Sequence, residues 1–320
     1  MNRRVRAVDV GGMELSITEQ SPDTPDTRPP VVLLHGFPDI GYTWRHQMDA
    51  IAGAGHRVIA PDQRGYGWSG TPEPIDAYGI FDLVGDVIGL LDAEGIEQCL
   101  LVGHDWGSIV AWHVALMRPD RLHGVVLMSV PYQPRTDRSV VDHIRATDPD
   151  GPFSYILAFQ EIGLAESLMD PDPVEFLRST HWKQSAAWLS TPEAASDLVP
   201  AGLPPYLDAA ELENYGRAFA RTGFRGGVNW YRNFQTNWER TRPWHDAAIT
   251  VPSSFIGGDN DFVVTRADGG LGSPVSAMAD SCEDHRSTTI VPGGHWAHQE
   301  HPGPVNEALL AFFASVCGDS

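Results

Sequence analysis

The chain has 320 residues, of which 42% are hydrophobic, enough for a sizeable core in one large domain or in a domain with an insertion. Its 22 basic and 42 acidic side chains give a formal net charge of −20, which excludes nucleic acid and anionic membranes as expected partners. Three cysteines without metal-type spacing, and no signal or transmembrane segment, predict a cytoplasmic protein without a disulfide framework.

The predicted elements begin with a β-hairpin formed by residues 5–10 and 13–18, on either side of Gly11-Gly12. Further apolar runs predict strands at residues 31–34, 57–60, 99–102, 124–128, 249–257 and 288–291. Helical patterns lie between or after these runs, at residues 78–93, 108–117 and 304–316. This alternation predicts an α/β fold, in which helices flank both faces of a mostly parallel sheet.

A long interval, residues 134–245, departs from this alternation. It contains helical and loop segments rich in Pro and Trp and no strand run, and the strand type returns only at residue 249. We therefore predict a core domain formed by residues 1–133 and 246–320, with a helical cap inserted at residues 134–245.

The segment Gly103-His104-Asp105-Trp106-Gly107 follows an apolar run and opens a helical pattern. Glycines two residues before and two residues after Asp105 suit a crowded strand-turn-helix junction, which is the pattern of a nucleophile elbow. A carboxylate needs no base to become nucleophilic at neutral pH, and the positive end of the following helix favours its ionised form. Asp105 is therefore suited to attack a saturated carbon and form an ester of itself, which a second step must hydrolyse.

Two later residues extend this pattern to a triad. Asp261 follows a late strand and His295 follows the last one, which gives the chain order nucleophile, acid, histidine. We expect His295 to deprotonate water, and Asp261 to orient the imidazole and stabilise the imidazolium. Asp259, two residues before Asp261, is the alternative for the acid role. Each position taken singly also fits an ordinary loop or turn residue.

The strand at residues 31–34 leads directly into the turn His35-Gly36-Phe37-Pro38. A turn that leaves a sheet at this point can aim a backbone N–H at the elbow. We expect the N–H groups of Phe37 and Trp106 to form an oxyanion hole for the tetrahedral oxyanion that develops when water adds to the Asp105 ester. His35 fits a structural role beneath the turn.

Four segments carry a resemblance to a known family: His35-Gly36-Phe37-Pro38, Gly103-His104-Asp105-Trp106-Gly107, Asp261-Phe262-Val263 and Gly294-His295-Trp296. Together they resemble the soluble epoxide hydrolases of the α/β-hydrolase superfamily, over nearly the whole chain. The resemblance implies the α/β-hydrolase fold with an inserted helical cap. It also implies two cap tyrosines that hydrogen-bond the epoxide oxygen, and Tyr155 and Tyr231 stand at the matching positions.

The two tyrosines answer a chemical need of ring opening. The departing alkoxide is a poor leaving group, and a phenol with a pKa of about 10 can donate first a hydrogen bond and then a proton to it. Either ring could instead be a packing residue in a helix. The implied reaction is hydrolysis of a small apolar epoxide by water to a vicinal diol, with no cofactor and no metal. The histidines also lack metal-type spacing.

Two alternative functions stay open. The oligomeric state is also open, and a homodimer is one option. The Asp elbow and the oxyanion turn are shared with haloalkane dehalogenases. In that case the indole of Trp106 would hold a halide, with Trp182 or Trp188 as the second donor. Some dehalogenases have Asn where this chain has Phe37, and some have their acid after the strand that here ends at residue 128, where no carboxylate follows. The second alternative is a ligand-binding protein on the same fold, although no catalytic group is missing here.

Overall fold

The computed structural model describes residues 3–23, 28–183, 200–265 and 274–318. They divide into two compact units. The first comprises residues 1–63, 83–134 and 246–320, and the second comprises residues 64–82 and 135–245. The sequence analysis assigned residues 64–82 to the core, because no change of composition marks them.

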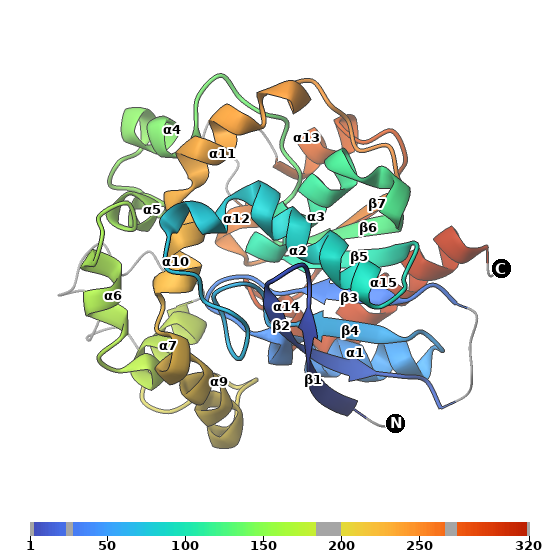
Figure 1. Cartoon of the computed structure of the whole chain (residues 1–320), viewed down its shortest axis with the longest axis horizontal. Helices are drawn as coiled ribbons and strands as arrows, with labels where there is room; N and C mark the ends of the chain where they lie inside the picture. Colours follow the sequence, from blue (N-terminus) through green and yellow to red (C-terminus); the bar gives the residue numbers. More distant parts are fainter. Residues whose placement is uncertain (1–2, 24–27, 184–199, 266–273, 319–320) are drawn as a thin grey trace. The chain divides into compact units, whose positions relative to one another are not determined.

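The first unit is built on one eight-stranded sheet, whose strand order is β1-β2-β4-β3-β5-β6-β7-β8 (Figure 1). Its strands are β1 (Arg3–Asp9), β2 (Glu14–Gln20), β3 (Val31–Leu34), β4 (Val58–Pro61), β5 (Cys99–His104), β6 (Leu122–Met128), β7 (Ser253–Gly258) and β8 (His285–Val291). The β1–β2 and β2–β4 pairs are antiparallel, and every other pair is parallel. The predicted hairpin and the predicted mostly parallel sheet are therefore confirmed.

The strand predicted at residues 249–257 begins later than expected. Pro252 has no N–H to give to a ladder, and β7 starts at the next residue, Ser253. Ile249 forms only an isolated parallel bridge to Cys282. A continuous apolar run predicted the strand, but the proline inside it marks the true boundary.

The helices of the first unit are α1 (Arg45–Gly53), α2 (Ile80–Ala93, whose first turn belongs to the second unit), α3 (Trp106–Met117), α12 (Phe262–Thr265), α13 (Pro274–Asp280), α14 (Ala297–Glu300) and α15 (Pro302–Cys317). Alternate strand residues such as Val31, Leu33 and Val102 pack in one core cluster with apolar side chains of α1 and α15. Because successive strand residues point to opposite faces, this cluster defines one face of the sheet. It anchors the strands whose carboxyl ends carry the site.

The second unit contains only helices within its described residues: α4 (Val140–Thr147), α5 (Ser154–Ala158), α6 (Leu164–Met169), α7 (Pro173–Lys183), α9 (Ala209–Thr222), α10 (Arg225–Arg232) and α11 (Phe234–Arg240). Residues 64–82 join them because side chains of α9 and α10 bind the carbonyl groups of this loop. Arg221 donates to the Gly67 carbonyl at 2.7 Å, and the Trp230 indole donates to the Arg64 carbonyl at 3.1 Å.

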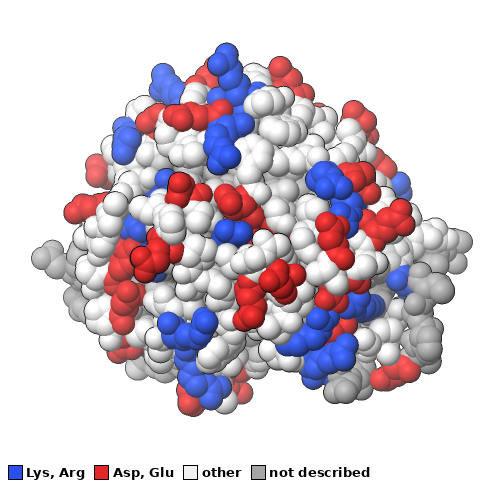
Figure 2. Space-filling model, in the orientation of Figure 1, with Lys and Arg blue, Asp and Glu red and all other residues white. Residues whose placement is uncertain are grey.

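Basic and acidic side chains are intermixed on the face drawn in Figure 2. Among the charged side chains of the described residues, Arg6 and Arg57 form ion pairs with Glu19. Among the helices of the described residues, none combines the length and the apolar character that a membrane crossing requires.

Candidate active site

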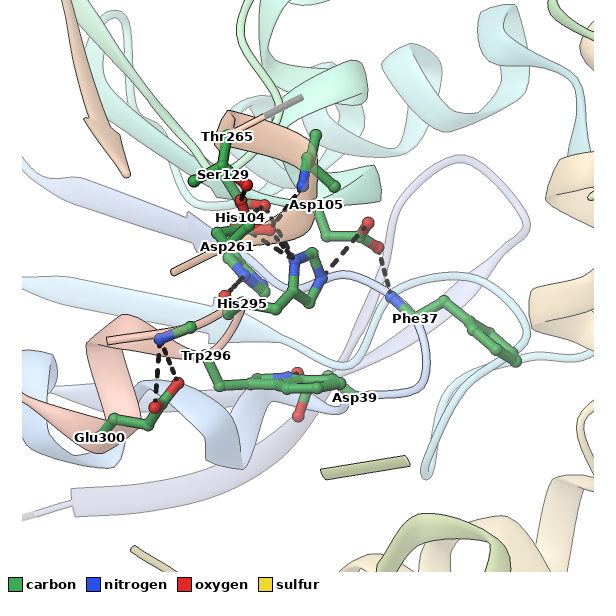
Figure 3. A network of polar contacts seen from close by, with 12 residues as sticks. Phe37, Asp39, His104, Asp105, Ser129, Asp261, Thr265, His295, Trp296 and Glu300 are labelled. Atoms are coloured by element: carbon green, nitrogen blue, oxygen red, sulfur yellow. Dashed lines mark hydrogen bonds and ion pairs between the residues drawn. The ribbon is translucent and has the colours of Figure 1, made fainter. Parts of the chain in front are cut away.

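Loops that follow five neighbouring strands of the first unit bring a set of polar groups together (Figure 3). The loops after β3, β5, β6, β7 and β8 carry, in that order, Phe37, Asp105, Ser129, Asp261 and His295. Since the carboxyl ends of adjacent parallel strands lie at one edge of a sheet, residues far apart in sequence become neighbours there.

Asp105 lies at a tight turn between β5 and α3, with φ 54° and ψ −118°. Residues other than glycine rarely adopt a positive φ. A Cβ atom on Gly103 would lie 2.1 Å from the carbonyl oxygen of Gly107, and one on Gly107 would lie 2.1 Å from that of Leu34. Close backbone contact therefore requires both glycines that flank the predicted elbow.

The carboxylate of Asp105 is bound by two backbone donors. Its Oδ1 atom accepts a hydrogen bond from the Phe37 N–H at 2.8 Å, and the Trp106 N–H is a second partner of the carboxylate. Burial raises the pKa of Asp105, whereas His295 and the two N–H groups act to lower it. The sequence analysis considered only the favourable helix end and missed the opposing effect of burial.

His295 lies between two carboxylates. Its Nε2 atom is 3.7 Å from Oδ2 of Asp105, and its Nδ1 atom is 3.3 Å from each carboxylate oxygen of Asp261. Burial lowers the pKa of His295, but the negative charges of Asp261, Asp105 and Asp39 outweigh burial and raise it to about 9. The imidazole of the free protein is therefore largely protonated at neutral pH.

The geometry distinguishes the two candidates for the acid. Asp261 is completely buried and accepts a second hydrogen bond from the Val263 N–H at 2.9 Å. Burial raises the pKa of Asp261, but His295, Ser129 and the Val263 N–H outweigh it and hold the pKa below its usual range. Asp259 is exposed and accepts a hydrogen bond from the Gly293 N–H instead. Asp261 is therefore the carboxylate at the imidazole.

Ser129 is a site residue that the sequence analysis missed. Its hydroxyl lies 2.9 Å from Nδ1 of His295 and 2.5 Å from Oδ2 of Asp261. The analysis noted only that no carboxylate stands after the strand now identified as β6. The available signal was topological: the residue after a strand between β5 and β7 must lie near the loops that carry Asp105 and Asp261, whatever its type.

Buried groups hold the loop of His295 in place. The His104 side chain donates from Nε2 to the His295 carbonyl at 2.7 Å, and the Gly294 N–H is 3.1 Å from both carboxylate oxygens of Glu300. The Trp296 indole donates to Asp39 at 2.7 Å. Burial lowers the pKa of His104 to about 3, so this ring is neutral and serves as a fixed donor.

His35 lies beneath the turn that carries Phe37. Its Nδ1 donates to the Gly36 carbonyl at 2.9 Å, and its Nε2 accepts from the Gln63 N–H at 2.9 Å. Burial lowers the pKa of His35 to about 4. The ring is therefore neutral, and both of its nitrogens are used to hold the turn.

The second unit brings Tyr155 of α5 and Tyr231 of α10 together. Both side chains are largely buried, and their ring centroids are 5.9 Å apart at an interplanar angle of 72°. Phe159 makes edge contacts with both rings, at centroid distances of 5.4 Å and 5.0 Å. The two tyrosines that the sequence pattern singled out are thus direct neighbours within one aromatic cluster.

The dehalogenase alternative needs a second indole N–H to hold the halide. The Trp182 indole N–H donates to the Gly202 carbonyl at 3.1 Å, and Trp188 lies outside the described residues. Within the part of the chain that the structure describes, no group of three or more His, Cys, Asp or Glu residues is arranged to hold a metal ion.

Comparisons with known proteins identify the family. The family model described as alpha/beta hydrolase fold matches residues 29–302, so the chain is a member of the α/β-hydrolase superfamily and the predicted fold class is confirmed. It is 41% identical to epoxide hydrolase A of Mycobacterium tuberculosis, over 97% of each chain, and 35% identical to an epoxide hydrolase of Caballeronia sordidicola, over 97% of this chain and 93% of the relative.

Solved structures give the same result. Epoxide hydrolase A from Mycobacterium thermoresistibile superposes with a TM-score of 0.86 at 39% identity, over 97% of this chain and 98% of that one. Epoxide hydrolase VrEH1 from Vigna radiata has a TM-score of 0.87 at 34% identity, over 98% of each chain. The chain belongs to the epoxide hydrolase family.

Proposed function

We propose that this enzyme hydrolyses a small apolar epoxide to a vicinal diol through a covalent ester of Asp105. The observation that carries the proposal is the environment of the Asp105 carboxylate. The Phe37 N–H binds its Oδ1 atom, the Trp106 N–H is a further donor to the carboxylate, and Oδ2 lies 3.7 Å from Nε2 of His295. This arrangement supports a two-step ester mechanism, which needs a nucleophile, an oxyanion hole and a base at one carboxyl group.

In the first step Oδ2 of Asp105 attacks one carbon of the epoxide from behind. A carbon–oxygen bond forms to the enzyme while the ring carbon–oxygen bond breaks, and the ring oxygen leaves as an alkoxide. Tyr155 and Tyr231 hydrogen-bond this oxygen, and one of them gives it a proton. The Phe37 N–H keeps Oδ1 in place, so Oδ1 becomes the carbonyl oxygen of the ester.

In the second step His295 takes a proton from water, and the hydroxide adds to the ester carbonyl carbon. The negative charge develops on Oδ1, where the N–H groups of Phe37 and Trp106 stabilise it. The ester bond then breaks, and the proton from His295 goes to the departing diol oxygen. The collapse leaves Asp105 as a carboxylic acid that contains one oxygen from water. Its proton returns by way of solvent to the tyrosinate formed in the first step, which regenerates both the Asp105 carboxylate and the tyrosine.

The charge of Asp105 links the two steps. The free carboxylate is one of the groups that raise the pKa of His295. Ester formation removes this negative charge, so the pKa of the imidazole falls and His295 becomes able to accept a proton from water. The neutral imidazole, which can act as a base, therefore forms at the stage when the second step requires it.

Single turnover in ¹⁸O-labelled water tests the proposal. Excess enzyme is incubated with styrene oxide, and the peptide that contains Asp105 is analysed by mass spectrometry. The proposal predicts one ¹⁸O atom in Asp105 after the first turnover, with unlabelled oxygen in the diol. Label in the diol alone would show direct attack by water.

Parallel assays separate the alternatives. Styrene oxide, an aliphatic epoxide and a brominated alkane are incubated with wild type and with Asp105→Ala, and both diol and free halide are measured. Diol that disappears in the variant supports the proposal. Halide release without diol would favour a dehalogenase and remove the role of the two tyrosines.

A further inference from the structure

Ser129 has no role in the two steps above, yet it lies inside the triad (Figure 3). Its hydroxyl oxygen is 2.9 Å from Nδ1 of His295, whereas both carboxylate oxygens of Asp261 are 3.3 Å from the same nitrogen. The nearest of these partners of the imidazole Nδ1 is therefore the serine hydroxyl and not the acid.

The hydrogen atoms of this contact can be assigned. A serine hydroxyl has one hydrogen, and an ionised carboxylate can only accept. The Ser129 hydroxyl donates to Oδ2 of Asp261 at 2.5 Å, so a lone pair of the hydroxyl oxygen faces Nδ1 of His295. That nitrogen must then carry a hydrogen in both protonation states of the ring. When the ring is neutral, Nε2 is consequently free on the side of Asp105.

The backbone at Ser129 indicates that this position is held firmly. Its φ is 66°, which is unusual for a residue with a side chain, and the residue is 3% exposed. The Ser129 N–H donates to the Ile256 carbonyl at 3.0 Å, and the next residue, Val130, is bound through its carbonyl by the Ser108 hydroxyl at 2.6 Å. Strand β7 and helix α3 thus hold the backbone at Ser129 and Val130 in place.

We propose that Ser129 is a positioning residue for the hydrolysis step, an inference that rests on the proposed function. Attack by Asp105 on the epoxide requires no base, so alkylation should not depend on the tautomer of His295. Attack by water does depend on this tautomer, because Nε2 of His295 must accept a proton while Nδ1 keeps its hydrogen. Ser129 bonds this hydrogen and carries the orienting effect of Asp261 to the ring.

The test measures the two half-reactions separately in Ser129→Ala. Rapid mixing with styrene oxide, followed by intact-protein mass spectrometry, gives the rates of ester formation and ester loss. We expect ester loss to slow by roughly tenfold, the usual effect of one hydrogen bond to a charged group, with ester formation unchanged. The Asp105 ester then accumulates in the steady state.

Ser129→Gly is the matched control, because it also removes the hydroxyl but adopts φ 66° without strain. Both variants must show the same defect in ester loss. Ester loss at the wild-type rate in either variant, or an equal fall of both half-reactions, would overturn the proposal. His295→Gln serves as a reference: if it forms no ester with the same substrate, the ester mechanism itself fails, together with the role of Ser129.

Discussion

Gly36 lies so close to Asp105 that a Cβ atom on Gly36 would be 2.4 Å from both Cβ and Oδ1 of the aspartate. Real Cβ atoms do not approach other atoms this closely. The turn that supplies the Phe37 N–H passes directly over Asp105, and only a residue without a side chain fits at this point. Here the glycine is needed for space, because its own backbone does not have a positive φ.

We expect Gly36→Ala to lower kcat/KM by at least about tenfold, because displacement of the carboxylate or of the turn breaks the 2.8 Å contact between Phe37 N–H and Oδ1. Steady-state kinetics and thermal unfolding measure the effect. The matched control is Gly53→Ala, where an added Cβ atom meets nothing within 4 Å. Equal activity of the two variants would contradict the role given to Gly36.

His295→Gln should trap the ester. Without a base the second step stops, whereas Asp105 can still attack, so the protein should gain the mass of one substrate molecule. Intact-protein mass spectrometry after incubation with styrene oxide measures this increase. Asp105→Ala in the same background should abolish it, and an adduct that persists in that double variant would place the modification elsewhere.

Tyr155→Phe and Tyr231→Phe should each slow ester formation by about 10- to 100-fold, because each variant removes one phenolic donor from the ring oxygen. The rate at which a preformed ester is hydrolysed should not change. Rapid-quench mass spectrometry separates the two rates. Tyr206→Phe is the control, since its hydroxyl already donates to the His181 carbonyl at 3.0 Å. A comparable fall of the ester-formation rate in the control would contradict the specific role of the pair.

Arg232 follows Tyr231 directly and uses all five of its N–H groups. It donates to the carboxylate of Glu166, to the side chain of Asn229 and to the carbonyl groups of Phe159 and Glu161. These bonds connect the end of α10 to the chain that follows α5. Because α10 and α5 carry Tyr231 and Tyr155, the bonds of Arg232 help to fix the position of one tyrosine relative to the other.

Arg232→Gln should therefore slow ester formation, and it should also destabilise the protein by about 3 kcal/mol or more, since it leaves a partly buried Glu166 unpaired. Chemical denaturation and the ester-formation rate measure both effects. Arg118→Gln breaks the exposed ion pair with Asp120 and should leave stability nearly unchanged, because solvent screens this pair. Similar losses in the two variants would contradict the bracing role of Arg232.

The raised pKa of His295 predicts a pH-dependent contribution to stability. Unfolded His has a pKa near 6.5, and the folded value is about 9, so the folded state binds the proton more tightly. This contribution is fully present below pH 6.5 and is lost as the pH rises through 9. Its full size is about 3 kcal/mol. Urea unfolding should show the wild type losing stability relative to His295→Gln over this interval, and parallel curves would contradict the raised pKa.

Much of the fold could be predicted because its signals are local. Continuous apolar runs identified the buried parallel strands, and the glycines around Asp105 identified the elbow by a spacing that backbone contact requires. The order of Asp105, Asp261 and His295 was also readable, because one strand precedes each of them. Such features depend on a few neighbouring residues only.

The rest depends on contacts between distant segments. Nothing near Ser129 in the sequence indicates that its hydroxyl meets His295, since this depends on which strands are neighbours. The grouping of residues 64–82 with the helical unit likewise rests on side chains of α9 and α10 that bind carbonyl groups. The choice between Asp259 and Asp261 required the direction of each side chain.

The order of the strands also has a consequence for synthesis of the chain. The ribosome produces the loop of Asp105 early, whereas the loop of His295 follows β8, which is an edge strand and the last strand of the described sheet in chain order. A nascent chain that has emerged only as far as β7 therefore carries Asp105 and Ser129 but no base. Emergence of the segment that carries His295, and not formation of the turn at Asp105, therefore determines when the proposed site is complete.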